Sequence, residues 1–578
     1  MGVLIAFLRG MGTEYRLDGR SAGIDDGWRR APVLRALGIL AIVSLLAGCG
    51  GSARHRSNTT TTHVSTRGST GTVVHPVATV DDFAAGSGGQ PDHLRVSIYD
   101  IRRSGPFVVV DFGVRCVQAS DSCSLEFDLA ADVHTQQGPT VYAHGGYGTA
   151  SGFTLVDSRA KKQYLPVTDS EKRPDSSHMS DLDVGSVTLG WVKFRAPPAS
   201  VQTADVLFPE GGPLVTGVPI GSGPAPSPSE VGPGVQAPTP AAFAYPESST
   251  TTAGLRLPVE DLNTVVGSSS GSDSEAAGRS TISLSSDVLF KFDKSNLTPV
   301  AQAILQNVAA RIKSGASGTV SVIGYTDSIG TDAVNIPLSQ ARAHSVVAAL
   351  EPLVDAAPVT FQASGMGSAD PVAPNTKPNG ADNPAGRALN RRVTISYAVK
   401  APAQPTAPPA SGPSSAPQTT AAGRTVTLKA NTDYLSTYTI TADRLFRTGN
   451  LAVLELSATC QNAASSEGCD GEFDLTGTPT VPPVPAETGG YPGGSAELDS
   501  ASGIYLKDPT TGAEYIPVYN ADRVPLTADV ESSMPTGATQ PLWIYFPAPP
   551  ASVTSLNIVL PAGPTISGMP VSATPPGG

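Results

Sequence analysis

The hydrophobic pattern divides this chain into two regions of short strands and one region that mixes strands with helices. Residues 108–114 and 452–458 are apolar or alternate between apolar and polar positions, as β-strands do. Around each stretch, other short strand patterns are separated by glycine- and proline-containing turns. The pattern predicts an all-β, immunoglobulin-like antiparallel sandwich in each of the two regions.

The region 278–399 has a different periodicity. Val300, Ile304, Val308 and Ile312 recur at helical spacing, behind a Thr298-Pro299 start that is typical of a helix N-terminus. The resulting βαβαββ order predicts an α+β domain, a mixed sheet with helices on one face. In chain order, the pattern predicts a strand at 282–290, a helix at 299–315, a strand at 320–324, a helix at 336–351, and strands at 359–363 and 392–397.

The two strand-rich regions repeat each other, and they are called here the first repeat (73–220) and the second repeat (424–572). Gly105 and Gly449 each lie eleven residues before a cysteine, and Trp191 and Trp543 each lie five residues before the sequence APPASV. Matches that keep their order and nearly constant spacing predict an internal duplication. Because both tryptophans recur, we expect them in the cores rather than at a ligand.

Three low-complexity segments separate these regions. They are rich in Ser, Thr, Pro and Ala, and such compositions predict tethers or spacers because they bury little apolar surface. The predicted organisation is a signal peptide at 1–48, a Ser/Thr-rich tether at 49–72, the first repeat at 73–220, a Pro/Ser-rich linker at 221–254, the α+β domain at 255–399 with its core at 278–399, a Pro-rich linker at 400–423, and the second repeat at 424–572.

The N-terminal region predicts export. Arg29, Arg30 and Arg35 precede an apolar run at 36–48, which at about 13 residues is shorter than a membrane-spanning helix. The run ends in Leu-Ala-Gly-Cys49, which resembles the lipobox of bacterial lipoproteins and implies a diacylglycerol anchor on Cys49. An uncleaved signal anchor or a chance cysteine is the alternative. The expected location is the cell envelope, on a membrane that faces the wall, which would be the outer membrane if the cell has one.

The net charge and the spacing of the cysteines narrow the range of possible partners and sites. The net charge of −12 disfavours nucleic acid as a partner, and no metal, cofactor or phosphate-binding motif stands out. In an oxidising compartment, the pairs Cys116 with Cys123 and Cys460 with Cys469 predict disulfides, because their spacing is poor for zinc.

Three sequence motifs in the central region belong together. They are VLFKFDKSNLTPVAQAIL (288–305), GYTDSIGTDAVNIPLSQARAHSVV (324–347) and GRALNRRVTI (386–395). In this combination they resemble the OmpA-like C-terminal domain, the peptidoglycan-binding module shared with Pal and MotB. The resemblance covers about a fifth of the chain and does not extend to the two repeats.

The resemblance implies non-covalent binding of the peptidoglycan stem peptide at meso-diaminopimelate. In such a site, Asp327 pairs with the free ammonium of that residue and Arg342 binds its carboxylate, which suits the planar guanidinium. Asn335 is expected to brace the loop between them. The alternative is that Asp327 and Arg342 form only a structural salt bridge. Residues expected to line the site with them are Thr326, Asp293, Asn296 and Arg391, the last of which could equally serve only the sheet.

The sequence therefore predicts a lipid-anchored, non-enzymatic protein that tethers a membrane to peptidoglycan and needs no cofactor. A rival hypothesis is an adhesin or receptor whose repeats bind a protein or glycan. A hydrolase would need a catalytic constellation, and residues 267–271 only satisfy the Gly-X-Ser-X-Gly pattern within a Ser/Gly-rich stretch.

Overall fold

In the computed structural model, the residues that can be described lie between positions 74 and 573, with gaps. They are residues 74–84, 92–123, 125, 149–209, 212–231, 235–236, 239–240, 246–354, 358–400, 424–429, 437–462, 469–470, 501–521, 524–528, 533–534, 536–560 and 565–573. The predicted signal peptide, Cys49, the Ser/Thr-rich tether and the segment 401–423 lie outside them. Within the described part of the chain, no helix combines the length and the apolar character that crossing a membrane requires.

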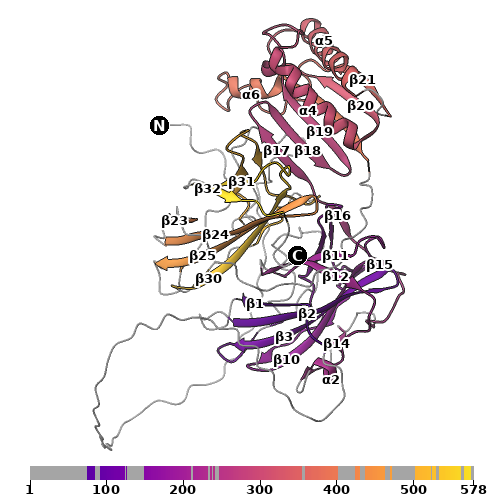
Figure 1. Cartoon of the computed structure of the whole chain (residues 1–578), viewed down its shortest axis with the longest axis vertical. Coiled ribbons are helices and arrows are strands. Elements are labelled where there is room, and N and C mark those ends of the chain that lie inside the picture. The colour runs from indigo at the N-terminus through magenta and orange to yellow at the C-terminus, as the bar shows by residue number, and fades with distance from the viewer. Residues whose placement is uncertain are drawn as a thin grey trace, which may run out of the picture. The chain divides into compact units, whose positions relative to one another are not determined.

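The first repeat is built from one path of paired strands, in the order β13-β10-β3-β2-β12-β11-β5-β6-β16, with β1 on β2 (Figure 1). Its core holds Phe112, Phe153 and Phe194, and Trp191 is buried as predicted. The strands are β1 (Ala78–Ala84), β2 (Asp92–Ser104), β3 (Phe107–Gln118), β4 (Ser122–Cys123), β5 (Thr154–Asp157), β6 (Lys162–Tyr164), β7 (Thr168–Asp169), β8 (Ser177–His178), β9 (Leu182–Asp183), β10 (Val187–Arg195), β11 (Thr203–Leu207) and β12 (Leu214–Gly221).

The second repeat has a four-stranded sheet, β23-β24-β25-β30, and a second run of strands, β28-β27-β31-β32. Trp543 is buried in its core, as predicted. The immunoglobulin-like type of both repeats stays a prediction. The strands are β23 (Thr425–Lys429), β24 (Thr437–Thr448), β25 (Leu451–Asn462), β26 (Cys469–Asp470), β27 (Tyr505–Lys507), β28 (Glu514–Tyr515), β29 (Ser533–Met534), β30 (Thr539–Pro547), β31 (Ser555–Val559) and β32 (Thr565–Pro570).

Matching positions of the two repeats make matching contacts. The Arg103 guanidinium donates to the carbonyls of Pro197, Pro198 and Val201, at 2.7–3.1 Å. In the second repeat, Arg447 donates in the same way, at 2.6–3.0 Å, to the carbonyls of Pro549, Pro550 and Val553. Each arginine thereby fixes the turn formed by its own APPASV sequence.

One of the two predicted disulfides is present. Cys116 near the end of β3 is bonded to Cys123 in β4, which closes the small loop expected from their spacing. The bond between Cys460 and Cys469 stays a prediction, because the side chain of Cys469 lies outside the described residues.

The segment predicted as a Pro/Ser-rich spacer is in fact partly ordered against the first repeat. Sheet edges carry unpaired backbone groups, and short segments, even with proline, can pair with them. The expectation that this composition would not fold is therefore wrong for these residues. These elements are α2 (Pro228–Val231), β13 (Val235–Gln236) on β10 and β14 (Thr239–Pro240) on β8. Two strands from the start of the segment predicted as the α+β domain also pair with the first repeat: β15 (Leu255–Arg256) on β7 and β16 (Val259–Asp261) on β6.

The central domain has the sheet order β21-β20-β22-β19-β18-β17, and β17 also pairs with β28 of the second repeat. Helices α4 and α5 cover one face of this sheet (Figure 1). Its elements are β17 (Thr264–Ser268), β18 (Gly271–Ala276), β19 (Arg279–Ser285), α3 (Ser286–Leu289), α4 (Pro299–Gly315), β20 (Ala316–Gly324), α5 (Asp332–Leu350), η2 (Glu351–Leu353), β21 (Val359–Gly365), α6 (Pro384–Asn390) and β22 (Arg392–Val399).

Helix α4 is confirmed, including its cap: the Thr298 hydroxyl accepts from the Ala301 N–H at 3.1 Å. Three details differ from the prediction. The strand predicted at 282–290 ends at Ser285, because the following turn is helical and the Ser286 N–H donates to the Arg391 carbonyl. Helix α5 starts at Asp332, four residues before the predicted start. Helix α6 and the hairpin β17–β18 were not predicted.

Helix α5 lies so close to β20 and β21 that two glycines are required. A Cβ on Gly324 would lie 2.1 Å from the Ser339 carbonyl oxygen, and one on Gly365 would lie 2.2 Å from the Gln340 amide nitrogen. Both distances are far below a real contact, so any side chain there would displace the helix.

Candidate functional site

Asp327 lies in the loop that follows β20, and the backbone around it is tightly held. The Thr326 N–H donates to the Gly367 carbonyl at 2.7 Å, and the Thr326 hydroxyl donates to the Asp327 carbonyl at 3.0 Å. One oxygen of the Asp327 carboxylate, Oδ1, accepts from the Ile329 N–H at 3.1 Å. Thr326 and Asp327 are both buried, so the carboxylate has little freedom to move.

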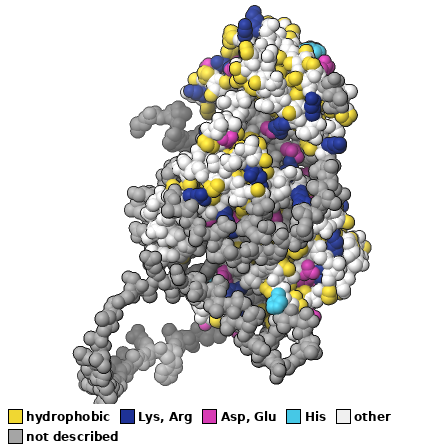
Figure 2. All heavy atoms as spheres, in the orientation of Figure 1, with side chains coloured by type: hydrophobic (Ala, Val, Ile, Leu, Met, Phe, Trp, Pro, Cys, Tyr) yellow, Lys and Arg dark blue, Asp and Glu magenta, His cyan; other side chains and the backbone are white. Residues whose placement is uncertain are grey.

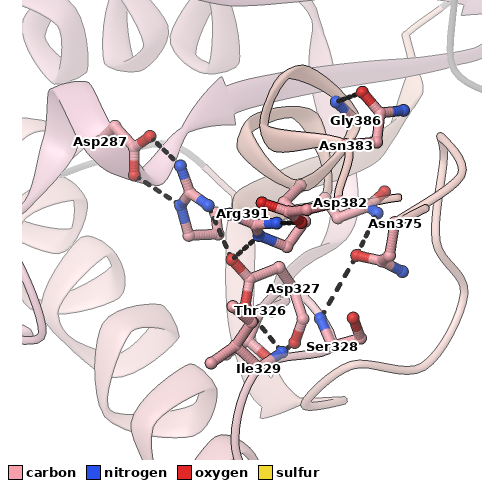
Figure 3. A network of polar contacts seen from close by, with 12 residues as sticks. Asp287, Thr326, Asp327, Ser328, Ile329, Asn375, Asp382, Asn383, Gly386 and Arg391 are labelled. Carbon is pink, nitrogen blue, oxygen red and sulfur yellow. Dashed lines mark hydrogen bonds and ion pairs between the residues drawn. The ribbon is translucent and has the colours of Figure 1, made fainter. Parts of the chain in front are cut away.

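The other carboxylate oxygen of Asp327 faces Arg391, which stands between two aspartates (Figure 3). Arg391 donates from Nη1 to Asp327 Oδ2 at 2.7 Å, and it binds the carboxylate of Asp287 bidentately at 2.8 and 2.6 Å. The hydrogen bonds to Asp287 raise the pKa of Arg391. Two carboxylates therefore share one guanidinium, which leaves this triad with one net negative charge.

A second arginine that the sequence reasoning missed also approaches Asp327. The Arg387 Nε lies 3.6 Å from Asp327 Oδ2, and Arg387 also forms an ion pair with Asp382. Arg387 and Arg391 are one helical turn apart in and just after α6, so they share a face. The GRALNRRVTI motif contains Arg387, but only the fold shows that it reaches Asp327.

Arg342 is buried in the middle of α5 and is oriented by the loop that follows α3. Its Nε–H donates to the Lys294 carbonyl at 3.0 Å, and its guanidinium carbon lies 5.3 Å from the centre of the Phe290 ring. Burial lowers the pKa of Arg342, and the nearby carboxylates of Asp287 and Asp293 oppose that shift. Among the described residues Arg342 forms no ion pair, so the predicted structural salt bridge with Asp327 is absent.

The loop between Asp327 and Arg342 is braced from inside. The Asn335 side-chain amide donates to the Ile329 carbonyl at 3.1 Å, and Asn335 is buried. Gly330 has a φ of +98°, a conformation that favours glycine. These contacts hold the loop in place next to the Asp327 carboxylate.

The long loop between β21 and α6 is tied to the same place. The Asn390 side chain exchanges two hydrogen bonds with the backbone of Ala373, at 2.8 and 3.0 Å, and donates to Asn375. Asn375 in turn accepts from the Ser328 N–H at 3.3 Å, next to Asp327 (Figure 3). Asn390 thus links the loop, α6 and the Asp327 site.

The remaining predicted residues lie at different distances from this arrangement. Asp293 and Asn296 are exposed in the loop that follows Phe290, and the charge of Asp293 acts on Arg342. Arg392, in contrast with its neighbour Arg391, faces the domain interior: its guanidinium stacks 3.8 Å from the centre of the Tyr325 ring and donates to the Asp370 carbonyl. Tyr325 therefore has a packing role.

The arrangement offers two charges of opposite sign. The triad of Asp287, Arg391 and Asp327 is net negative. The Arg342 guanidinium is positive, and only its Nε takes part in the hydrogen bond described above. Asp287 of the triad lies in α3, and the loop that follows α3 orients Arg342 through the Lys294 carbonyl. Such a site can hold a zwitterion. The described residues contain no group of three metal-ligating side chains.

Comparison with known proteins identifies the family of the central domain. Residues 289–384 match the OmpA family, so the chain contains an OmpA family domain. The chain is 47% identical over 92 residues to outer membrane protein P5 of Haemophilus influenzae, covering 16% of this chain and 26% of that protein. It is 43% identical over 99 residues to outer membrane protein A of Escherichia coli O157:H7, covering 17% and 28%.

Solved structures are similar over the same region. One is the peptidoglycan-associated lipoprotein from Burkholderia pseudomallei, which is 33% identical with a TM-score of 0.16, covering 19% of this chain and 87% of that one. Another is the cell wall anchor of the T6SS from Pseudomonas aeruginosa, which is 30% identical with a TM-score of 0.19, covering 23% and 89%. The chain spans about a quarter of the length of the curated relatives named above.

Proposed function

We propose that the central domain binds peptidoglycan non-covalently, at the free amino-carboxylate centre of diaminopimelate in the stem peptide. The observation that carries this proposal is Arg342. It is buried, its Nε is fixed by the Lys294 carbonyl, and it has no carboxylate partner among the described residues. A buried guanidinium gains most from a ligand carboxylate that it can bind through two nitrogens.

The ammonium of the same centre goes to Asp327. Its carboxylate already accepts from Arg391 and lies 3.6 Å from Arg387, but Asp287 pairs with Arg391 and Asp382 pairs with Arg387. One negative charge therefore remains for an ammonium. The OmpA family match at 289–384 supports this assignment, and the two curated relatives named above are outer membrane proteins.

The wider function follows from where this domain stands in the chain. With a lipid on Cys49 and wall binding at the centre, the protein is an exported, non-catalytic tether between a membrane and peptidoglycan. Support for the anchor comes from the sequence of residues 36–49.

The test is binding of the full chain to diaminopimelate-type sacculi, and calorimetric titration with the tripeptide L-Ala–γ-D-Glu–meso-diaminopimelate. Arg342→Ala and Asp327→Ala should each weaken binding about 10- to 100-fold, because each removes a charge-assisted contact. Lys313→Ala is the matched control, since Lys313 is exposed on α4. Circular dichroism checks that each variant is folded.

Lysine-type sacculi provide a second control on the ligand side. Lysine lacks the carboxylate of the free centre, so wild-type binding should weaken by a similar factor, and Arg342→Ala should then add little. Unchanged binding by both Arg342→Ala and Asp327→Ala would remove the site from consideration.

A further inference from the structure

Exposed hydrophobic side chains concentrate in the central domain. Figure 2 shows hydrophobic side chains standing among basic and polar ones on this part of the surface. Phe292 is the extreme case: 96% of it is exposed, against 62% for Ile329. A ring exposed to this extent adds nothing to the core, so its whole face is available to a ligand. The described residues with large exposed apolar side chains are Val184, Phe292, Val300, Ile329, Val334, Ile336 and Met366.

Phe292 is held outward by the geometry of its loop. A backbone bridge between Phe290 and Leu297 closes the loop, and the Lys294 N–H donates to the Lys291 carbonyl at 3.0 Å. Asp293 takes a φ of +56°, the left-handed conformation that Asp tolerates better than most residues. Phe290 is buried in the core, while Phe292 projects from the tip of the same loop.

The Phe292 loop is also part of the proposed diaminopimelate site. The Lys294 carbonyl accepts from Arg342, and Asp293 acts electrostatically on it. Phe292 is two residues from Lys294, and two residues span at most about 7 Å. With the length of the Phe292 side chain added, the exposed ring lies within roughly 15 Å of the Arg342 guanidinium, which donates to the Lys294 carbonyl.

The stem peptide has a sugar at a matching separation. Diaminopimelate is its third residue, and the free amino-carboxylate centre lies at the end of its side chain. That side chain, the γ-linked D-Glu and the L-Ala together separate the free centre from the lactyl group of the muramyl saccharide by roughly 15 Å when extended. A pyranose ring has one face made of C–H groups, which can pack on an aromatic ring without losing the hydrogen bonds of its hydroxyls.

We propose that Phe292 is a saccharide platform, on which a sugar ring of the glycan strand packs while the Asp327 and Arg342 site holds diaminopimelate. This inference rests on the proposed function. The charged residues Lys291, Asp293 and Lys294 flank Phe292 in the sequence. The apolar surface of this loop tip is therefore limited to the Phe292 ring. A protein partner would need about 800 Å² per side, whereas a single sugar ring needs only the one aromatic face.

The experiment compares two probes on the full chain by calorimetry: the free tripeptide L-Ala–γ-D-Glu–meso-diaminopimelate, and the same tripeptide carried on N-acetylglucosaminyl–N-acetylmuramic acid. Wild type should bind the saccharide-bearing probe about tenfold more tightly, and Phe292→Ala should remove that advantage while changing tripeptide binding less than about twofold. Phe292→Trp should retain the advantage.

Val300→Ala is the matched control, because Val300 is also exposed (60%) but lies in the first turn of α4. It should change neither affinity. Equal weakening of both probes by Phe292→Ala would assign Phe292 to the peptide and overturn the saccharide assignment. Equal wild-type affinity for the two probes would overturn it too. Wild type that binds neither probe would instead remove the proposed function.

Discussion

The two repeats share the contacts that hold their APPASV turns, but they differ at one surface. The difference shows what covers that surface in each repeat. In the first repeat this surface carries Arg102 and Lys193, and the matching positions of the second carry Phe446 and Tyr545. Lys193 donates to the Pro246 carbonyl at 2.8 Å, and Arg102 pairs with Glu247. The first repeat is therefore covered by its own linker.

The second repeat is covered at the same surface by the first. The Tyr545 hydroxyl donates to Asp205 at 2.9 Å, and the Trp543 indole donates to the Gly212 carbonyl at 2.8 Å. Val156 and Leu207 of the first repeat join the hydrophobic core of the second. Charged residues thus face a linker and aromatic residues face a folded module, so any partner of the repeats has to use another surface.

The largest effect is expected from removing the buried positive charge that the first repeat carries at this surface. Lys193 is fully buried and pairs with Asp175 at 3.1 Å, so Lys193→Met should lower the free energy of unfolding by about 3–5 kcal/mol. The second repeat has Leu526 where the first has Asp175, as the matching backbone bonds to Val518 and Val167 show. Adding Asp175→Leu should recover most of the loss.

Denaturant titration followed by Trp191 fluorescence measures both variants, since the Lys193 ammonium lies 5.1 Å from that ring. A double variant as unstable as the single one would show that apolar residues cannot replace the Lys193–Asp175 pair in the first repeat, although the second repeat has apolar or aromatic residues at the matching positions.

An intermediate effect concerns the contact between the repeats. Burial raises the pKa of Asp205 to about 6, although the Gly217 N–H and the Tyr545 hydroxyl oppose the shift. Because the folded pKa is higher than the unfolded one, the folded state binds more protons. The contribution of Asp205 to stability should therefore be fully present below about pH 4 and be lost, by roughly 3 kcal/mol, as the pH rises through 6.

Asp205→Asn tests this, because the second repeat already has Asn557 at the matching position, where it accepts from Gly568. Unfolding free energies of variant and wild type, measured between pH 4 and 8, should differ by an amount that changes with pH. Asp111, whose pKa burial raises to about 7, contributes equally to both. A difference that stays constant with pH would contradict the assignment.

The smallest effect should be the same in both repeats. Arg103→Ala and Arg447→Ala each remove three bonds to carbonyls of the APPASV turn. Each loss should cost about 1–2 kcal/mol, because these guanidinium groups are partly exposed. Unfolding followed by circular dichroism gives both values. A large loss for one arginine and none for the other would mean that the turns are not equivalent.

The sequence was most informative where function depends on short motifs. The periodicity of Val300 to Ile312 and the Thr298 cap predicted α4, and cysteine spacing together with the expected export predicted the Cys116–Cys123 bond. Local patterns could not predict that residues 235–261 add strands to the first repeat, because the edges they pair with are far away in the chain.

The same limit applies to the candidate site. Asp327 and Arg342 were found by motif, but the partners of Asp327 were not. Arg391 contacts Asp327 across 64 residues and Asp287 across 104. No periodicity links positions so far apart, and only the pairing of β22 with both β19 and β20 brings them together.

The two glycines beneath α5 have a genetic consequence. A random search for variants that lose wall binding should recover substitutions at Gly324 and Gly365, which contact no ligand, because a Cβ at either would push on the backbone at Ser339 or Gln340. These residues lie within one turn of Arg342 in the helix that carries it. Loss of binding in such a screen would identify positions that set the depth of a helix as well as those that touch peptidoglycan.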